Sequence, residues 1–160
     1  MPARSGIGYD AHPLVAGRPL VLGGVVIPFE KGLSGHSDGD SLVHALIDAL
    51  LGAAALGDIG THFPASDPQY KGIACTILLD KIGQLLNERG WRIVHVDATI
   101  LAERPRMRPH IDDMRQNIAK TLNLELDSVS VKASTNNGLG AIGRGDGVAA
   151  MAIATIEAAG

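Results

Sequence analysis

The hydrophobic positions of the chain follow two periods, one of two residues and one near 3.6, which are typical of strands and of helices. Strands are predicted at residues 6–9, 91–101, 129–133 and 148–156. Helices are predicted at residues 41–56, 72–89 and 109–122. Strands mixed with three helices predict an α+β fold, a single domain over residues 1–160 with helices packed on one face of a mixed sheet.

Glycine and capping residues supply the expected breaks between these elements. Gly23-Gly24 separates two short apolar runs, residues 19–22 and 25–28, and predicts a hairpin. Asp40 precedes the first helix and is a good N-cap. The remaining polar and Gly-rich stretches, residues 29–39, 57–68 and 136–147, are expected to be loops.

Composition excludes several classes of protein. The chain has 160 residues, a formal charge of −3, 46% hydrophobic residues and 3% aromatic residues. It is too apolar to be disordered and too acidic and poor in aromatics for a nucleic-acid binder. The single cysteine excludes a disulfide framework, and no apolar run is long enough to span a membrane. A cytoplasmic enzyme or binding protein is expected.

Asp10, His12 and His44 are the first candidates for chemistry. Asp10 and His12 are two residues apart, so on an extended segment both side chains point the same way and can meet one metal ion. His44 lies with Ser41 and Asp48 on a narrow polar stripe of an otherwise apolar helix. The stripe fits either a core histidine satisfied by Asp48 or a metal ligand oriented by Asp48. The pair on the strand also fits a turn aspartate with a surface histidine.

The segment of residues 36–40 leads into the same helix. A helix N-terminus favours anions, so His36 and Ser37 are candidates for phosphate contact, although Asp38 and Asp40 also fit an ordinary capping loop. The open coordination position expected beside two histidines and one aspartate is typical of a catalytic zinc site.

Two further loops carry weaker signals. In residues 57–67, glycines permit close approach and the aspartates suit sugar hydroxyls, but Asx turns explain the loop equally well. Residues 138–147 imitate a dinucleotide-binding loop, yet an apolar strand follows them instead of a helix, which excludes that function. Arg144 suits a phosphate or a pairing with Asp146 or a neighbouring subunit.

Several of these motifs occur together in one known family. The chain resembles the 2-C-methyl-D-erythritol 2,4-cyclodiphosphate synthase family over essentially its full length. The matching motifs are Gly8-Tyr9-Asp10-Ala11-His12, His36-Ser37-Asp38-Gly39-Asp40 with His44, Ala54-Ala55-Leu56-Gly57-Asp58-Ile59-Gly60, Phe63-Pro64, Asp67-Pro68, Pro105-Arg106-Met107, Pro109-His110-Ile111, Val131-Lys132-Ala133 and Gly143-Arg144-Gly145. The ordered combination is highly specific, although each motif alone is not.

The resemblance implies a phosphorus–oxygen lyase of the non-mevalonate isoprenoid route. It converts 4-diphosphocytidyl-2-C-methyl-D-erythritol 2-phosphate to the 2,4-cyclodiphosphate and releases CMP. By the same resemblance Asp10, His12 and His44 bind one divalent metal per subunit, zinc above others, and His36 and Thr135 are the catalytic pair that orients the phosphates. A second ion, magnesium or manganese, is implied on the substrate diphosphate.

The remaining implied site residues share the task of binding substrate. In addition to Asp10, His12, His36 and Thr135, they are Ser37, Asp58, Ile59, Gly60, Phe63, Pro64, Asp67, Ala102, Pro105, Arg106, Met107, Arg108, Ser134, Asn137 and Arg144. Asp58 and Gly60 would hold the ribose, Ala102 and residues 105–108 the cytosine, and Ser134 with Thr135 the diphosphate. The substrate's own phosphate is the nucleophile, in agreement with the lack of a Ser/His/Asp set.

The chain departs from the family at three positions. Asn137 stands where a glutamate commonly helps to hold the second metal, Ala141 stands where Phe lines an isoprenoid cavity on the trimer axis, and Asp146 replaces a frequent glutamate. Two other functions stay open from the residues themselves. One is a zinc phosphoesterase that activates water, and the other is a metal-dependent nucleotide-binding module.

The surplus of small apolar residues has an expected cause. The resemblance implies a homotrimer with sheets facing the three-fold axis and active sites between subunits, which would cover apolar surface. An isolated protomer is therefore expected to be poorly soluble. No nucleic-acid or membrane partner is expected, and the lack of a transit segment favours a bacterial cytoplasm.

Overall fold

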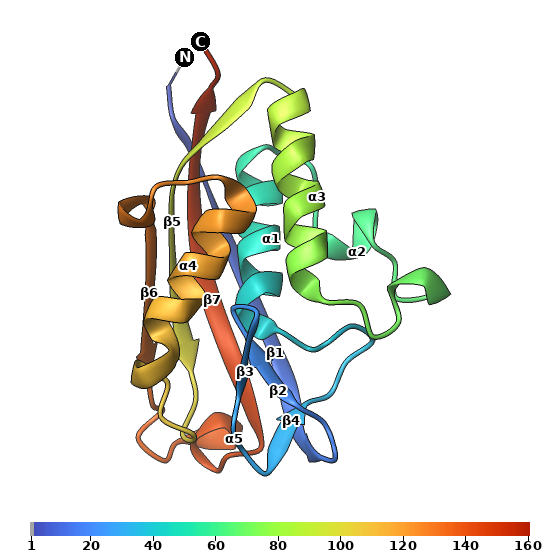
Figure 1. Cartoon of the computed structure of the whole chain (residues 1–160), viewed down its shortest axis with the longest axis vertical. Helices are drawn as coiled ribbons and strands as arrows, with labels where there is room; N and C mark the ends of the chain where they lie inside the picture. Colours follow the sequence, from blue (N-terminus) through green and yellow to red (C-terminus); the bar gives the residue numbers. More distant parts are fainter. Residues whose placement is uncertain (1) are drawn as a thin grey trace.

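A five-stranded mixed sheet with the strand order β4-β1-β7-β5-β6 forms the framework of the computed structural model, which describes residues 2–160 (Figure 1). The strands are β1 (Arg4–Ala16), β4 (Lys31–Leu33), β5 (Trp91–Leu101), β6 (Val129–Ser134) and β7 (Gly147–Ala158). Only β5 and β6 pair in parallel within this sheet. A separate hairpin joins β2 (Leu20–Leu22) to β3 (Val25–Ile27), as the Gly23-Gly24 signal predicts.

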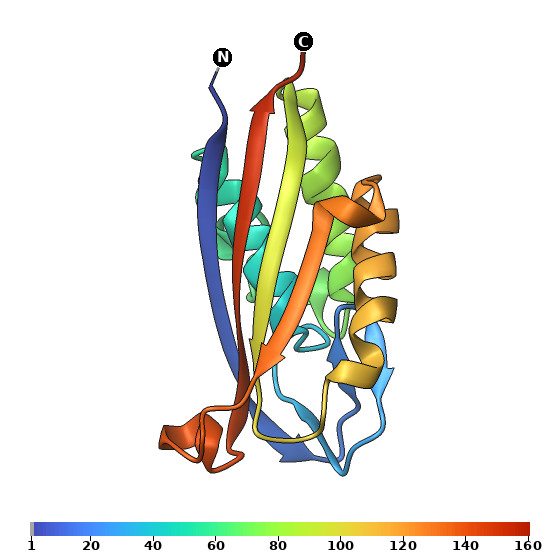
Figure 2. The same ribbon diagram turned by 90° about the vertical axis from the view of Figure 1, so that its left-hand side faces the viewer.

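The long helices cover one face of the sheet, which confirms the predicted α+β architecture (Figure 2). The helices are α1 (Ser41–Ala53), α2 (Ile59–His62), α3 (Cys75–Glu88), α4 (Ile111–Leu122) and α5 (Gly140–Gly143), with 3-10 turns η1 (Pro68–Tyr70), η2 (Arg108–His110) and η3 (Leu126–Ser128). Across residues 2–160, no helix is both long and apolar enough to cross a bilayer.

Three segments predicted as loops contain short elements, so those predictions were wrong in part. β4, α2 and α5 have only three or four residues each, too few for a hydrophobic period to appear in the sequence. Pairing of Leu14 with Leu33 defines β4, and the Asp58 side chain caps α2. Helix α3 begins at Cys75 and not near residue 72, because Gly72 has a left-handed φ of 71°.

Glycines in β1 allow helix α1 to lie directly on the strand. A Cβ at Gly6 would be 2.1 Å from the Ala49 carbonyl oxygen, and one at Gly8 would be 1.9 Å from that of Ala45. Any side chain at these positions would force the helix outward. Because side chains of a strand alternate, Asp10 and His12 point to the same face as Gly6 and Gly8, toward α1.

Among residues 2–160, no long helix covers the opposite face of the sheet, which exposes large apolar side chains (Figure 2). Ile7 and Tyr9 on β1 pair across strands with Ile153 and Met151 on β7. Their exposed fractions are 67%, 58%, 51% and 43% in that order. We call these four residues the open-face patch. A contiguous apolar patch of this kind is typical of an interface.

Candidate active site

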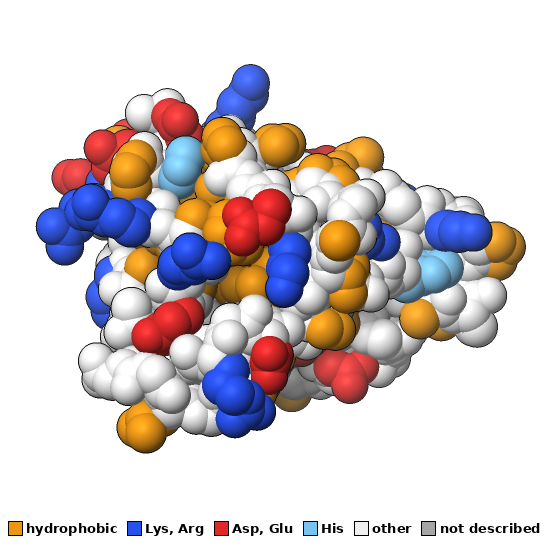
Figure 3. Space-filling model, turned by 90° about the horizontal axis from the view of Figure 1, so that it is seen from below, with side chains coloured by type: hydrophobic (Ala, Val, Ile, Leu, Met, Phe, Trp, Pro, Cys, Tyr) orange, Lys and Arg blue, Asp and Glu red, His pale blue; other side chains and the backbone are white. Residues whose placement is uncertain are grey.

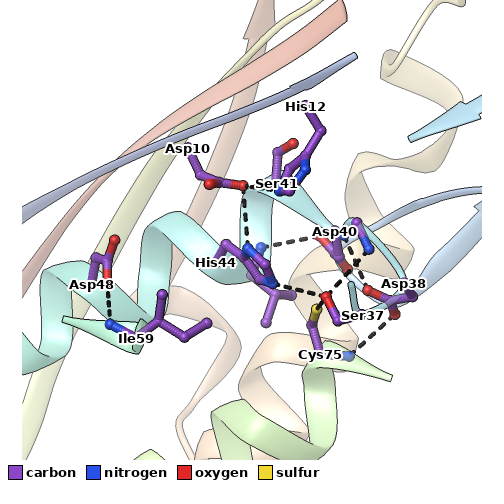
Figure 4. A network of polar contacts seen from close by, with 12 residues as sticks. Asp10, His12, Ser37, Asp38, Asp40, Ser41, His44, Asp48, Ile59 and Cys75 are labelled. Atoms are coloured by element: carbon purple, nitrogen blue, oxygen red, sulfur yellow. Dashed lines mark hydrogen bonds and ion pairs between the residues drawn. The ribbon is translucent and has the colours of Figure 1, made fainter. Parts of the chain in front are cut away.

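Asp10 and His12 of β1 and His44 of α1 form one compact cluster at the edge of the helix-covered face (Figure 4). The ligand atoms that they offer all lie within 4.8 Å of one another. His12 Nε2 is 2.7 Å from Asp10 Oδ2, and His44 Nδ1 is 3.3 Å from the same oxygen. The prediction that these three side chains meet is confirmed, and one aspartate with two histidines is a ligand set that suits zinc.

Hydrogen bonds on the far side of each ring orient both histidines. His12 Nδ1 donates to the Ser34 carbonyl oxygen at 2.7 Å, so Nε2 presents its lone pair to the cluster. His44 Nε2 lies 3.1 Å from Ser37 Oγ, which leaves Nδ1 to face Asp10. Within residues 2–160, Asp10 Oδ2 and His12 Nε2 are buried without a hydrogen-bond partner. Buried polar atoms without a partner are rare, and a carboxylate oxygen and an imidazole nitrogen are both ligands of divalent cations.

Electrostatics inside the cluster favour an ionised carboxylate. Burial opposes ionisation of Asp10, but the adjoining rings of His12 and His44 outweigh it, so the pKa of Asp10 lies below its usual value. The Asp10 carboxylate raises the pKa of His12, against the opposing effects of partial burial and of the Arg18 charge. A proton on His12 therefore competes with any metal for the same carboxylate.

Among the described residues Asp48 makes no hydrogen bond or ion pair with His44, so the role expected for Asp48 in both interpretations was wrong, while the place of His44 in a candidate metal cluster stands. Asp48 Oδ1 instead accepts a hydrogen bond of 2.7 Å from the backbone N–H of Ile59 (Figure 4). Burial and the nearby charges of Asp58 and Asp10 raise the pKa of Asp48. Asp48 thereby links the start of α2 to helix α1. The hydrogen-bond partner of His44 is Ser37, in the position that was expected for Asp48.

The two aspartates before α1 are caps, as the ordinary interpretation of this segment predicts. Asp40 Oδ1 accepts from the N–H groups of Val43 and Gly23 at 3.0 Å each, and Oδ2 accepts from Gly24 at 2.9 Å. Asp38 Oδ2 accepts from the N–H of Cys75 and so caps α3. The segment between β4 and α1 is thus tied to the hairpin turn and to both helices.

His36 and Ser37 differ in how free their side chains are. His36 Nε2 donates to the Asp67 carbonyl oxygen at 3.1 Å, which leaves Nδ1 available. Ser37 is only 6% exposed, and its Oγ lies 3.2 Å from Cys75 Sγ as well as beside His44. Burial and the charges of Asp38 and Asp40 raise the pKa of the Cys75 thiol, so this cysteine is no nucleophile.

Many of the predicted site residues line a cavity of about 230 Å³ beside the cluster, which we call the metal cavity. Its lining residues are His12, His36, Ser37, His44, Ile59, Gly60, Phe63, Ala65, Tyr70 and Leu78. Asp58 lies at the start of α2, where its exposed carboxylate accepts from the N–H and hydroxyl of Thr61. The hydroxyl and N–H of Thr61 lower the pKa of Asp58.

A second group of predicted residues lines a separate cavity of about 560 Å³ at the ends of β5 and β6, which we call the strand-end cavity. It is lined by Ala102, Glu103, Pro105, Arg106, Met107, Arg108, Ile111, Asp112, Val131, Lys132, Ala133, Ser134 and Thr135. The cytosine and diphosphate residues implied by the resemblance therefore lie together, apart from the metal cavity.

The sheet register shows how far apart the two cavities lie. Asp10, Ala150, Ile100 and Ala133 form one row across β1, β7, β5 and β6. Three strand spacings of about 4.8 Å put about 14 Å between the ends of this row. Ala150 and Ile100 in between are fully buried. One chain therefore does not bring Ser134 and Thr135 to its own metal cluster.

Glu103 is a site residue that the sequence did not reveal. Its carboxylate oxygens accept from the N–H groups of Asn136 and Gly138 at 3.0 and 3.1 Å. It thereby holds the turn that carries Asn137, whose φ of 53° is left-handed. The one sequence signal for this long-range contact is the position of Glu103 next to the Pro105-Arg106-Met107 motif.

Arg144 lines neither of these cavities. Its Nε lies 3.2 Å from Asp146 Oδ2, one of the pairings that the sequence left open. It lines a third cavity of about 280 Å³ with Phe29, Lys31 and Arg104. Seen from the end that carries α5, acidic side chains accompany the basic ones around an apolar area (Figure 3).

Comparison with known proteins agrees with the sequence motifs. A family model described as the YgbB family matches residues 3–157. A 2-C-methyl-D-erythritol 2,4-cyclodiphosphate synthase from Clostridium perfringens is 58% identical over 150 residues, which are 94% of this chain and 96% of that protein. The synthase of Alkaliphilus oremlandii is 57% identical over 153 residues, 96% of this chain and 98% of that protein.

Solved structures show the same fold. A 2C-methyl-D-erythritol-2,4-cyclodiphosphate synthase in its CDP-bound form has a TM-score of 0.88 at 35% identity and covers 96% of this chain and 100% of its own. The bifunctional IspDF from Campylobacter jejuni has a TM-score of 0.95 at 38% identity over 98% of this chain, which spans 42% of that protein. The chain therefore belongs to the YgbB family of cyclodiphosphate synthases, as its motifs indicate.

Proposed function

We propose that this chain converts 4-diphosphocytidyl-2-C-methyl-D-erythritol 2-phosphate to 2-C-methyl-D-erythritol 2,4-cyclodiphosphate and CMP in isoprenoid biosynthesis. The convergence of Asp10, His12 and His44 on one point, in a member of this family, carries the proposal. The 2-phosphate oxygen of the substrate attacks the β-phosphorus, and the bond from that phosphorus to the CMP oxygen breaks. CMP leaves with the electron pair of that bond, so the enzyme needs no nucleophile of its own.

The metal that fits the cluster is one divalent ion per chain, and zinc suits the two imidazoles and one carboxylate best. When bound, it supplies Lewis-acid polarisation and a fixed position for the phosphates. Asp10 contributes a negative charge to the metal site. The Ser34 carbonyl orients the imidazole of His12 toward that site, and the Ser37 hydroxyl orients the imidazole of His44. These contacts fix the ligands before substrate arrives, so little reorganisation accompanies binding.

The side chains around the metal cavity have positioning tasks. His36 Nδ1 faces the substrate phosphate, since its Nε2 is committed to Asp67, and with Thr135 it orients the two reacting phosphates. Asp58 and Gly60 at the start of α2 receive the ribose, and Asp48 fixes their backbone through Ile59. Orientation of an intramolecular attack is worth effective molarities on the order of 10⁵ M or more.

The strand-end cavity is the site proposed for cytosine, framed by Ala102 and residues 105–108, with Ser134 and Thr135 on the diphosphate. A second ion, magnesium or manganese, accompanies that diphosphate. The neutral amide oxygen of Asn137 gives this ion a weaker partner than a carboxylate would.

A complete site needs the metal cavity of one chain and the strand-end cavity of another, because about 14 Å of buried sheet separates them within one chain. A head-to-tail contact gives a closed ring when the rotation between subunits closes. We propose a homotrimer in which the open-face patches turn toward the axis. Residue 141 is Ala and not the Phe that lines an isoprenoid cavity in the family, so we do not propose that an isoprenoid diphosphate binds on the trimer axis. The enzyme is proposed to act in a bacterial cytoplasm.

The test is incubation of the protein, metal and substrate followed by phosphorus NMR. Cyclic diphosphate with an equal amount of CMP is expected. A ring-free hydrolysis product would instead identify the phosphoesterase that uses the same ligands to activate water. Binding of CDP without any turnover would identify a nucleotide-binding module.

A further inference from the structure

Arg18 is a half-buried cation in the turn between β1 and β2 that none of the roles described so far explains. Within residues 2–160, no ion pair joins it to a carboxylate. Its guanidinium donates instead to two backbone carbonyl oxygens, from Nη1 to Gly35 at 3.2 Å and from Nη2 to Ser37 at 2.9 Å. The planar fork of arginine suits such a double contact, which a lysine cannot reproduce.

Those two carbonyls belong to a segment of four residues, Ser34–Ser37, that holds both histidines of the metal cluster. At its start, the Ser34 carbonyl accepts from His12 Nδ1 at 2.7 Å. At its end, Ser37 Oγ lies 3.1 Å from His44 Nε2. One short segment therefore orients two ligands that come from different elements, β1 and α1.

The segment also lies so close to His12 that its position matters. A Cβ at Gly35 would be 3.1 Å from His12 Cε1, so the backbone at Gly35 packs directly on the imidazole. A shift of the segment would move the hydrogen-bond acceptor of His12 and the ring together. Arg18 binds the middle and the end of this segment, at Gly35 and Ser37, and is not among the residues that line the metal cavity.

We infer that Arg18 is a positioning residue of the metal centre: it fixes the Ser34–Ser37 segment, and through it the directions of His12 and His44. This inference rests on the proposed metal centre. Removal of a group that orients a metal-bound histidine typically weakens metal binding by about 10–100-fold. Arg18 acts one step farther away, and its loss is expected to weaken zinc binding by about tenfold.

The chain offers a matched control in Arg115. This arginine of α4 also donates to two backbone carbonyl oxygens, from Nε to Val129 at 2.8 Å and from Nη2 to Leu126 at 3.1 Å. Its acceptors lie in η3 and at the first residue of β6, and neither contacts a ligand of the metal cluster. Arg18→Met and Arg115→Met each remove a double contact to backbone carbonyls, and Arg115→Met also removes an ion pair of 3.8 Å with Asp112. Only the first variant acts on the metal centre.

The experiment measures the zinc Kd of full-length wild type and both variants by competition with a chromogenic chelator, together with thermal unfolding of the metal-free proteins. Arg18→Met is expected to raise the Kd about tenfold, with that of Arg115→Met within twofold of wild type. An unchanged Kd for Arg18→Met, with lower thermal stability like that of Arg115→Met, would show a merely structural role and overturn the inference. Wild type that binds no zinc would instead overturn the metal centre itself.

Two further variants keep the test decisive. Arg18→Lys retains the charge and stem but not the fork, so a Kd between those of wild type and Arg18→Met is expected. If Arg18→Met does not fold, a wild-type Kd for Arg18→Lys overturns the inference. Ser37→Ala removes the contact to His44, and its effect on Kd should be smaller in the Arg18→Met background, because both act through one segment. Additive effects would contradict this route.

Discussion

His12 Nε2 and Asp10 Oδ2 lie 2.7 Å apart and are buried, yet neither atom makes a hydrogen bond of acceptable geometry. The alternation of β1 places both side chains on the face toward α1, and the glycines at positions 6 and 8 let α1 approach until His44 joins them. The main-chain fold thus brings a carboxylate and two imidazoles together at one point.

Removal of His44 should abolish zinc binding and turnover together. His44→Ala deletes one of three metal ligands. Its effect on zinc affinity should therefore exceed the loss of about 10–100-fold that follows removal of a group that only orients a ligand. Zinc content measured on the purified protein should fall from about one ion per chain to a trace. His62→Ala is the matched control, since this half-buried histidine donates to the Leu56 carbonyl outside the cluster. Loss of zinc with intact turnover in His44→Ala would contradict a metal-centred reaction.

Zinc binding should release a proton from His12. The Asp10 carboxylate raises the pKa of His12 above 6.5, so the metal-free cluster is protonated at and somewhat above that pH. Titration calorimetry in two buffers of different ionisation enthalpy should show net proton release near pH 6.5, fading as the pH rises past the pKa. Proton uptake, or release that is independent of pH, would argue against this order of events.

The same shift predicts how the metal-free protein responds to pH. A raised His12 pKa contributes stability that is fully present below 6.5 and is lost as the pH rises through the folded-state pKa. Saturating zinc should remove this part of the dependence, because the bound ion replaces the proton.

Asp40 should make the fold less stable at neutral than at mildly acidic pH. Complete burial raises the pKa of this carboxyl from 3.8 to about 6, so the protonated form is favoured in the folded protein. Its contribution is present below about pH 4 and lost as the pH rises through 6. Relative to Asp40→Asn, wild type should lose about 2 kcal/mol in the free energy of unfolding between pH 4 and 7. Urea unfolding of both proteins measures the difference, and a constant difference would contradict the prediction.

Local sequence signals were enough to predict the helix and the strand that carry the metal cluster. The Asp40 cap and the apolar run after it correctly predicted where α1 begins. The spacing of Asp10 and His12 correctly predicted that they share a face, although the strand was predicted only for residues 6–9 and β1 runs from Arg4 to Ala16. The assignment to a family rested on ordered motifs and not on periodicity. The family model over residues 3–157 confirms that assignment.

The contacts that complete the site join residues that lie far apart in sequence, and no local pattern encodes them. Helical periodicity places His44 and Asp48 on one stripe, but a backbone N–H eleven residues further along, at Ile59, binds Asp48. Arg18, Ser37 and Glu103 each act on a segment that the fold brings next to them. Donor direction, which decides these pairings, follows from three-dimensional packing.

Asn137→Glu should lower the magnesium concentration that supports half-maximal turnover. A carboxylate at this position offers the diphosphate-bound ion a charged oxygen in place of a neutral one. Asn123→Glu is a close control, because Asn123 has a φ of 55° and Asn137 one of 53°, so both variants carry the same backbone strain. Superimposable magnesium titrations of wild type and Asn137→Glu would refute the role of this position.

Ile153→Lys should break the proposed trimer. Ile153 is 51% exposed in the open-face patch, and a charge buried there between chains would cost several kcal/mol. Ile77→Lys is the control, since Ile77 is 49% exposed but lies on α3, away from the open face. Light scattering should give a trimer for wild type and Ile77→Lys and a smaller or aggregated species for Ile153→Lys.

Turnover should fall when the trimer is lost, because the metal cavity and the strand-end cavity of different chains then no longer meet. A stable, soluble wild-type monomer would overturn the assembly, and a trimeric Ile153→Lys would remove the open face from it.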